Sequence, residues 1–557
     1  MGIGGVRRQA RRAGRLVQAR RRRPHTVRHA GRAGGPGQRA AARSPRPIRC
    51  AACGRRRHVR VESRHSRSDC VDARRHGAAD WWRRGRRDCV LDSMFQRELT
   101  AGSHADVGRR RGRCARRPDR ERGSGSMIAP TSTALAPDQA LPHRDILLDA
   151  ASMRPVLSRL GAAALVRIDS CSLIRVNYQV GRSLRAQFRI ETDGAFYTVA
   201  ARMFRGAKSL DAYQRSLGSA RNVGPLSGVA LADDLGSVFW VVPNDRKIHT
   251  LAAVLDPATP VPGVETGREI RRRLVAYAPE KSATLVCEGV DGIPLAYAKV
   301  AAAQQASRDY DTYASLHARL DPRDPRLRLP CALEYSAAHR TLWLEAVHGR
   351  RMAETAADDE IVEIADLERF GAAVAAFHRL SVPHAPPLDR FSPAHLRDDA
   401  AIIRTIRPDV SNAVEHLAAR LIAAAVPDAG AVCLHGDLHP KNAIVCGDRV
   451  TLIDVEDVAL GAAAADIGSL LASLVYRRET GRLSREAYRV RVQAFFGGYE
   501  AVRRLPATSS IQWHTAAALL VERATRAVTR IRPLGLEHLP ALLSTSERLL
   551  DFPVEIQ

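Results

Sequence analysis

The residues best suited to chemistry lie in one loop and in the run that follows it. The segment 434–445 reads LHGDLHPKNAIV and the segment 450–457 reads VTLIDVED, so apolar, strand-like runs flank a polar loop. Asn442 follows Asp437 by five residues, and Asp454 follows Asn442 by twelve. Phosphoryl transfer needs a carboxylate to orient the attacking hydroxyl, and oxygen ligands to hold Mg²⁺ on the ATP phosphates. This spacing supplies one candidate base and two candidate metal ligands.

The loop and the strand after it resemble the aminoglycoside phosphotransferase and choline kinase group of protein-kinase-like small-molecule kinases. The matching features are the His-Gly-Asp-x-x-x-x-Asn loop, its distance to the Ile-Asp strand, and the later Asp466. The resemblance covers roughly residues 271–557. It implies an α+β, protein-kinase-like fold with a small β-rich N-lobe and a mostly helical C-lobe, and it implies use of ATP and Mg²⁺.

The resemblance also implies a role for each residue of the motif. Asp437 would be the catalytic base, and Asn442 and Asp454 would bind Mg²⁺. His435 and Asp466 would be structural residues that hold the loop through hydrogen bonds. A solvated loop aspartate is the alternative for Asp437 taken alone.

The N-lobe of such a kinase should supply a strand lysine for the ATP phosphates. Lys299, in the run 295–300, fits this role, although a lone strand lysine could equally be exposed. The run 342–347 fits the hinge that faces adenine, where backbone groups make the hydrogen bonds, and Glu345 and Val347 are its candidate residues.

Two features depart from the family pattern. The helix after Lys299 lacks the usual glutamate partner, and Asp309 and Asp311 are the candidates in its place. No G-x-G-x-x-G run is present, but the turn 279–282 could cover phosphates with its backbone N–H groups. We therefore expect the details of the ATP site, rather than the fold, to differ from the family.

The elements that must position these residues show a repeat. One series of elements occurs twice, about 100 residues apart. In order, it contains a strand, a turn, a strand, an Asp-Gly turn, a strand ending in a basic residue, a helix and a strand with a Trp. We interpret this as a duplicated module, with chance similarity of short strands as the alternative. The first copy, 173–245, resembles a kinase N-lobe without its own C-lobe. Because Arg202 stands where the second copy has Lys299, we expect a non-catalytic cap or substrate-shaping module.

The chain after about residue 360 carries apolar residues at helical spacing. The amphipathic stretches are 361–380, 414–425, 465–476, 485–505, 513–531 and 539–550. A further helical pattern precedes the first strands, over 146–165.

The basic charge of the chain is confined to its first 126 residues. These hold 36 Arg, no Lys and 10 acidic residues, a net charge of +26, whereas 127–557 carries +2. The segment is of low complexity, with no apolar period that could build a core. It fits a basic arm for nucleic acid, a disordered tail, or GC-rich DNA translated ahead of a true start near Met127, and we favour the last of these.

The domain expectations follow from these patterns. They are the Arg-rich segment 1–126, a linker 127–145, an N-terminal module 146–270, a kinase-like N-lobe 271–347 and a helical C-lobe 348–557. No apolar run of 18 residues exists, which excludes a membrane-spanning helix. The five cysteines after residue 126 stand singly, which fits reduced thiols and a cytoplasmic protein.

The expected function is an ATP-dependent phosphotransferase acting on a hydroxyl of a small molecule of the aminoglycoside, sugar or amino alcohol class. Two alternatives stay open: a pseudokinase that binds nucleotide or a partner without turnover, and a nucleic-acid-binding protein that uses the Arg-rich segment. Four acids are candidates for contacting a cationic acceptor, with solvated surface acids as the simpler account: Asp398, Asp399, Glu456 and Asp457.

Overall fold

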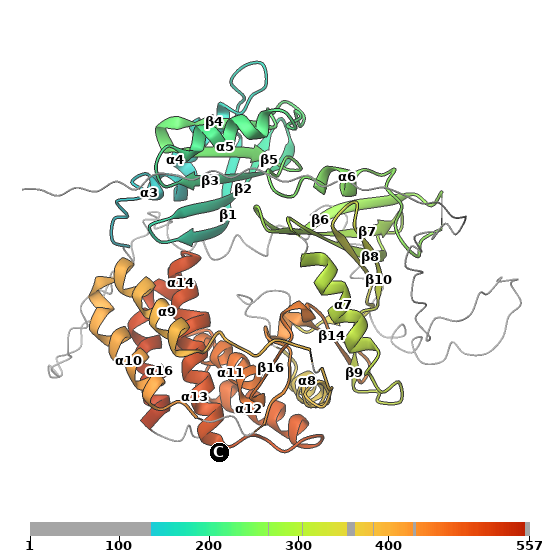
Figure 1. Cartoon of the computed structure of the whole chain (residues 1–557), viewed down its shortest axis with the longest axis vertical. Coiled ribbons are helices and arrows are strands. Elements are labelled where there is room, and N and C mark those ends of the chain that lie inside the picture. Colours follow the sequence, from blue (N-terminus) through green and yellow to red (C-terminus); the bar gives the residue numbers. More distant parts are fainter. Residues whose placement is uncertain are drawn as a thin grey trace, which may run out of the picture. The chain divides into compact units, whose positions relative to one another are not determined.

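The structure is a computed structural model that describes residues 135–265, 267–303, 305–353, 362–382, 384–426 and 430–551. The Arg-rich segment 1–126 and the start expected near Met127 lie outside these ranges. The described elements form an α+β fold in which two five-stranded antiparallel sheets precede a mostly helical region (Figure 1). This is the α+β fold class that the sequence predicted, with two β-rich modules ahead of the helical region.

The first module begins with two short helices rather than with the one helix predicted over 146–165. They are α3 (Arg144–Leu148) and α4 (Ala150–Ser158). Asp149 between them is extended, and its carboxylate accepts hydrogen bonds from the amides of Ala151 and Ser152. An aspartate in this position caps a new helix, which is why the helical pattern breaks there.

The sheet of the first module has the strand order β1-β2-β3-β5-β4. Asp193 and Gly194, which join β2 to β3, both have positive φ angles, of 52° and 73°. Two such residues form the tight hairpin turn that the Asp-Gly pair predicted. The elements of this module are β1 (Ser170–Gln179), β2 (Ser183–Thr192), β3 (Ala195–Phe204), α5 (Lys208–Leu217), β4 (Val229–Ala232), β5 (Ser237–Val241) and α6 (Leu251–Leu255).

The second sheet has the equivalent order, β6-β7-β8-β11-β10, and a helix again follows its third strand. The elements are β6 (Ile270–Ala278), β7 (Ser282–Gly289), β8 (Pro294–Ala301), α7 (Gln305–His317), β10 (Ala332–Ser336) and β11 (Thr341–Glu345). The two sheets therefore share one topology, while a common origin by duplication stays a prediction.

The two sheets also share one hydrophobic cluster. Trp240 of β5 and Trp343 of β11 are both buried in it, and Trp240 Nε1 donates a hydrogen bond of 2.7 Å to the hydroxyl of Tyr277 on β6. Burial of large aromatic side chains contributes strongly to stability. The first module is thus packed against the second one rather than merely linked to it.

The rest of the chain is mostly helical, with short strands that carry the polar loop. The strands are β9 (Leu327–Arg328), β12 (Arg350–Arg351), β13 (Val432–Leu434), β14 (Ala443–Cys446), β15 (Arg449–Leu452) and β16 (Ala459–Gly461). The helices are α8 (Ile364–Phe377), α9 (Pro393–Ile406), α10 (Ser411–Ala423), α11 (Ala463–Glu479), α12 (Arg485–Glu500), α13 (Thr508–Ala518), α14 (Thr525–Thr529), α15 (Pro533–Glu537) and α16 (Leu539–Asp551).

The helix predicted over 513–531 has an interruption. Between α13 and α14, residues Leu519–Ala524 form a π-helical stretch. Such stretches change the direction of the side chains that follow and are frequent at functional sites. Helical periodicity alone does not reveal them, because the apolar spacing continues through the stretch.

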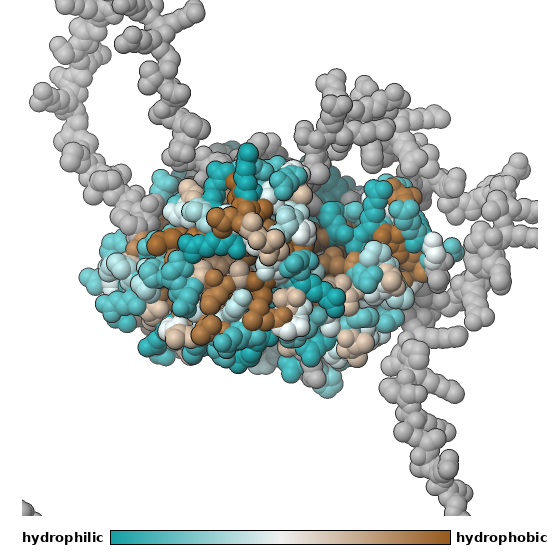
Figure 2. Space-filling model, turned by 90° about the horizontal axis from the view of Figure 1, so that it is seen from above, coloured by the Kyte–Doolittle hydropathy of each residue, from teal (hydrophilic) through white to brown (hydrophobic). Residues whose placement is uncertain are grey.

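Apolar residues lie among polar ones on the face of the molecule seen in Figure 2. The large apolar side chains that stay exposed are spread over several elements: Ile146, Leu165, Phe196, Leu210, Leu217, Val290, Ile293, Ile364 and Val490. Exposed apolar residues scattered in this way are normal for a protein surface. Within the described ranges, no helix has both the length and the apolar character needed to cross a membrane.

Candidate active site

The polar loop begins directly after β13 and depends on a glycine. Gly436 has a φ of +83°, which side chains other than glycine adopt rarely. A Cβ atom on Gly436 would also lie 1.9 Å from the carbonyl oxygen of Asp457. The loop therefore approaches the turn after β15 so closely that only glycine fits.

Asp466, in the first turn of α11, ties the loop down. Its buried carboxylate accepts hydrogen bonds from the amides of His435, at 2.6 Å, and Gly436, at 3.1 Å, and from His378 Nε2, at 3.1 Å. Burial alone would raise the pKa of Asp466, but His378 and the amide contacts outweigh it, so the pKa lies below its ordinary value. The aspartate is thus ionised and positions two consecutive residues of the loop.

His435 joins the loop to the next strand. Its buried ring lies with Nε2 3.0 Å from the carbonyl oxygen of Ile453, and Nδ1 accepts a hydrogen bond of 3.4 Å from the amide of Asp437. These two contacts fit a neutral ring protonated on Nε2. The ring thereby fixes the loop relative to Ile453, the residue just before Asp454.

Asp437 is the partly exposed carboxylate of the loop. Its two oxygens lie 3.5 Å from His439 Nε2 and 3.8 Å from Arg526 Nη1. Burial would raise the pKa of Asp437, but His439, Arg526 and Lys441 hold it well below its ordinary value. The carboxylate is therefore ionised at neutral pH and surrounded by donors.

Asn442 is buried beside Asp437. Its side-chain nitrogen Nδ2 donates a hydrogen bond of 3.1 Å to the backbone carbonyl of Asp437, and the backbone carbonyl of Asn442 accepts one from the amide of Ile453. The amide nitrogen is occupied in this way, so the side-chain oxygen Oδ1 is the atom of Asn442 that remains as a possible ligand.

Lys299 of β8 meets the second carboxylate of the motif. Its ammonium donates hydrogen bonds to both Asp454 and Glu456, which follow β15. Burial lowers the pKa of Lys299, but the negative groups around it outweigh this effect and hold the pKa well above its ordinary value. Lys299 of the second sheet is thus charged and contacts the carboxylates of Asp454 and Glu456 in the helical region.

The acid that pairs with Lys299 besides Asp454 is Glu456, rather than Asp309 or Asp311 of α7. Asp309 is buried and accepts a hydrogen bond of 2.9 Å from Gln305, and no ion pair joins it to Lys299. Tyr313 of the same helix donates a hydrogen bond of 3.3 Å to Glu456. Glu456 was considered in the sequence only as a contact for an acceptor, because its distance from Lys299 along the chain hides their proximity.

Asp454 has an unusual backbone conformation. Its φ and ψ angles of 59° and 47° are left-handed, although it is not a glycine. Such a conformation costs free energy and persists where the surrounding structure requires it. Here it starts the short 3₁₀ turn Val455–Asp457, so that Asp454 and Glu456 can both reach Lys299.

Glu345 and Val347, the candidates for the hinge, lie at and just after the end of β11. Glu345 is paired with Ala296 of β8, and its amide donates a hydrogen bond of 3.0 Å to the carbonyl of Cys331. Both residues are half-buried. The candidate hinge thus lies on β11, the strand next to the one that carries Lys299, and the amide of Glu345 is already occupied.

The turn 279–282 is anchored to the first module. The carboxylate of Glu280 has no exposed surface and forms ion pairs with Arg185, Arg202 and Arg246. The amide of Glu280 donates a hydrogen bond of 2.8 Å to Asp245. The turn therefore offers fewer free N–H groups for phosphates than the sequence suggested.

The remaining oxygen ligands suit Mg²⁺. Among the described residues, no group of three or more His, Cys, Asp or Glu side chains could hold a metal ion. Mg²⁺ needs no such cage, because it keeps several waters and takes one or two carboxylates together with phosphate oxygens. Asp454, whose side chain is half exposed, and the Oδ1 atom of Asn442 provide hard oxygen atoms of this kind.

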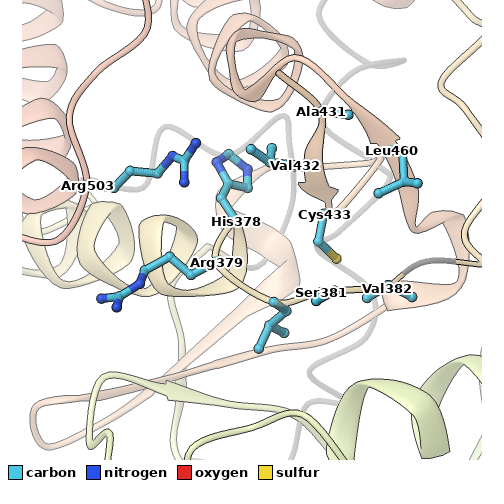
Figure 3. Close-up of a pocket in the computed structure, with 10 residues that line it drawn as sticks. His378, Arg379, Ser381, Val382, Ala431, Val432, Cys433, Leu460 and Arg503 are labelled. Carbon is cyan, nitrogen blue, oxygen red and sulfur yellow. The ribbon is translucent and has the colours of Figure 1, made fainter. Parts of the chain in front are cut away.

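A pocket of about 400 Å³ lies at a different place, beside β13 (Figure 3). It shares His378 with the Asp466 network, but Asp437, Lys299 and Asp454 do not line it. The lining residues are His378, Arg379, Leu380, Ser381, Val382, Ala431, Val432, Cys433, Leu460 and Arg503. The reactive groups of the loop therefore do not face this pocket.

Sequence reasoning missed the arginines near Asp437. Arg523, Arg526 and Arg530 recur at the spacing i, i+3 and i+7, which places them along one side of a helix. That spacing was a readable signal, but nothing in the sequence indicated that Arg523 and Arg526 lie near Asp437. Of the four acids considered for an acceptor, Asp399 of α9 lies near enough to Arg526 for their charges to interact.

One family model matches part of the chain. The model of the phosphotransferase enzyme family matches residues 248–505, and so leaves out most of the first module. No curated protein matches the chain.

Solved structures give weaker likenesses. A spectinomycin phosphotransferase bound to ADP and spectinomycin is 12% identical, with a TM-score of 0.38, over 51% of this chain and 95% of that one. A macrolide 2'-phosphotransferase from Brachybacterium faecium is 18% identical, with a TM-score of 0.34, over 53% and 97%. A choline kinase from Cryptosporidium parvum is 12% identical, with a TM-score of 0.37, over 53% and 95%. Residues 248–505 thus match the phosphotransferase enzyme family.

Proposed function

We propose that this protein is an ATP-dependent phosphotransferase that acts on a hydroxyl group of a small molecule. The observation that carries the proposal is the meeting of Lys299, from the second sheet, with Asp454, seventeen residues after Asp437 in the helical region. Phosphoryl transfer depends on positioning and on charge stabilisation, and this arrangement supplies groups for both.

Asp437 would orient the attacking hydroxyl. Because its carboxylate is ionised, it can accept a hydrogen bond from the hydroxyl and take up the proton as the new bond forms. The low pKa makes Asp437 a weak base, which suits a reaction in which the proton leaves late. His439 and Arg526 hold the carboxylate on its other sides.

Lys299 would bind the ATP phosphates, and Glu345 and Val347 would border the adenine. Asn442 and Asp454 would hold Mg²⁺, which supplies neutralisation of phosphate charge when bound. Lys299 already bonds Asp454 and Glu456, so its ammonium is fixed at the end of β8 before nucleotide arrives. A preorganised charge of this kind stabilises a transition state without further rearrangement.

The test is ATP turnover by the full chain against a panel of hydroxyl compounds, compared with the variant Asp437→Asn. Asparagine keeps the size of the side chain but cannot take up the proton. We expect acceptor-dependent formation of ADP and a phosphorylated product, lost in the variant, while both proteins bind Mg-ADP. Nucleotide binding without turnover for any acceptor would favour the pseudokinase alternative.

A further inference from the structure

Six cationic side chains form a cluster of interacting charges, three members of which, Lys441, Arg523 and Arg526, interact with Asp437. They come from the loop itself, from the helix that contains the π-helical stretch, from the residues after it, and from the first module. They are Lys441, Arg523, Arg526, Arg530, Arg532 and Arg175.

The helix contributes Arg523 and Arg526, which both interact with Asp437. Arg526 Nη1 lies 3.8 Å from Asp437 Oδ1, and its side chain is 41% exposed. Arg523 Nη2 donates a hydrogen bond of 3.4 Å to the carbonyl of Ser469, and its buried Nε has no partner among the described residues. An unpaired donor in a buried position costs free energy unless a ligand satisfies it.

The first module completes the cluster. Arg530 Nη1 donates a hydrogen bond of 3.4 Å to the carbonyl of Val176 on β1, and β1 packs against α14 (Figure 1). The neighbouring Arg175 donates one of 3.4 Å to the carbonyl of Tyr277. Since the family match begins only at residue 248, this contribution comes from a part of the chain outside it.

The cluster has too little negative charge to balance it. Within the described ranges, Arg175, Arg523, Arg530, Arg532 and Lys441 form no ion pair. Burial and the charges of Arg175, Arg526 and Arg532 lower the pKa of Arg530 to about 10, so these groups repel one another.

The nearby acids do not supply the missing charge. Glu522 is already bound by Arg390, at 2.6 Å, and by Ser469, at 2.9 Å. Burial raises the pKa of Asp399 to about 7, so this carboxyl is only partly ionised at neutral pH. An incoming anion is therefore the simplest source of the charge that the cluster lacks.

Building on the proposed function, we propose that the acceptor is an anion: a hydroxyl compound that also carries a phosphate or carboxylate group, which these arginines bind while its hydroxyl lies at Asp437. Guanidinium groups are well shaped for paired hydrogen bonds to phosphate and carboxylate oxygens. Arg523 and Arg526 lie near Asp437, whereas the nucleotide would lie with Lys299 and Asp454, so we place the arginines on the acceptor side. Lys441 lies near enough to both carboxylates for their charges to interact. A cationic acceptor would be repelled.

The test is calorimetric binding to the full chain saturated with Mg-ADP. The probes are glucose, glucosamine, glucuronate, glucose 6-phosphate and inorganic phosphate, which differ in charge. We expect glucose 6-phosphate to bind at least about tenfold more tightly than glucose, because hydrogen bonds between charged groups are the stronger ones. We expect glucosamine to bind more weakly than glucose, and the anion affinity to fall with added salt.

Arg530→Gln and Arg532→Gln should each weaken binding of the phosphorylated probe about tenfold, since each removes one charged donor. Arg548→Gln, which changes an exposed arginine of α16, should leave it unchanged and is the matched control. Thermal melts of all three variants check folding, and two cluster variants keep the test valid if one fails to fold.

Three results would overturn the inference: equal or tighter binding of glucose or glucosamine, no binding of any anionic probe, or cluster variants that weaken Mg-ADP instead of the anion. The last result would assign the arginines to the nucleotide. Absence of Mg-ADP binding by the unaltered chain would instead count against the proposed function, so the two failures can be told apart.

Discussion

Lys299 and Arg202 stand at matching positions of the third strands in the two sheets, but they have different partners. Lys299 bonds Asp454 and Glu456 in the helical region. Arg202 bonds Glu280, in the turn that precedes β7. Under the proposed function the lysine would reach phosphates held at Asp454, whereas the arginine is bound in a buried ion pair.

We therefore expect Lys299→Ala to reduce kcat for ATP turnover by about 10²–10³, the usual effect of removing one charge that stabilises a transition state. Arg202→Ala should change kcat far less, although it should lower stability. Steady-state kinetics on both variants would measure this difference. A larger kcat loss for Arg202→Ala would mean that the catalytic and non-catalytic modules are assigned the wrong way round.

Asp309 provides a pH-dependent test at a single residue. Burial raises the pKa of its carboxyl from 3.8 to about 6. Because the folded pKa is above the unfolded one, the folded state is penalised as pH rises from about 4 to 6, and the full penalty remains above pH 6. Asp309→Asn should remove that penalty. It should therefore raise the free energy of unfolding by on the order of 1–3 kcal/mol at pH 8 and by less at pH 5. Urea unfolding of both proteins at the two pH values measures this stabilisation. A stabilisation that is larger at pH 5 than at pH 8 would contradict the raised pKa of Asp309.

At the scale of elements, Glu280 links the two sheets. Its buried carboxylate receives Arg185 and Arg202 of the first sheet and Arg246 from the loop after it. The same turn precedes β7 of the second sheet, and the amide of Glu280 is held by Asp245. The position of this turn is thus set by the first module.

Glu280→Gln should destabilise the protein by about 3–5 kcal/mol, because it leaves three partly buried arginines without their counter-charge. Glu288→Gln is the control, since Glu288 lies on β7 and pairs with the exposed Arg273; such surface pairs contribute only about 0–1 kcal/mol. Denaturant midpoints measure both effects. Equal losses in the two variants would show that the buried cluster has no special role.

The sequence predicted the elements better than it predicted the contacts between them. The alternating strands, the Asp-Gly turn and the polar loop were readable because each depends on residues close together in the chain. The break at Asp149 and the π-helical stretch were missed, since apolar spacing continues through both. The pairing of Lys299 with Glu456 joins residues 157 positions apart, and no local pattern could reveal it.

At the scale of the whole chain, the site is assembled from three regions. The second sheet supplies Lys299, the helical region supplies Asp437 and Asp454, and the first module brings Arg175 close to Arg530 of the arginine cluster. A role for the first module in shaping the substrate site, expected from the sequence, remains a proposal that these contacts support. This proposal depends on how the first module packs against the helical region, which the sequence of a single motif does not reveal.

Nucleotide binding by two aspartate variants tests the assignment of roles most directly, because it needs no knowledge of the acceptor. Asp454→Ala should weaken Mg-dependent ATP binding by at least about tenfold, since it removes the proposed metal carboxylate and a partner of Lys299. Asp437→Ala should leave ATP binding nearly unchanged, since Asp437 would contact only the acceptor hydroxyl. Calorimetric titration with ATP, with and without Mg²⁺, would show this difference if the account is right, and equal affinities of the two variants would contradict it.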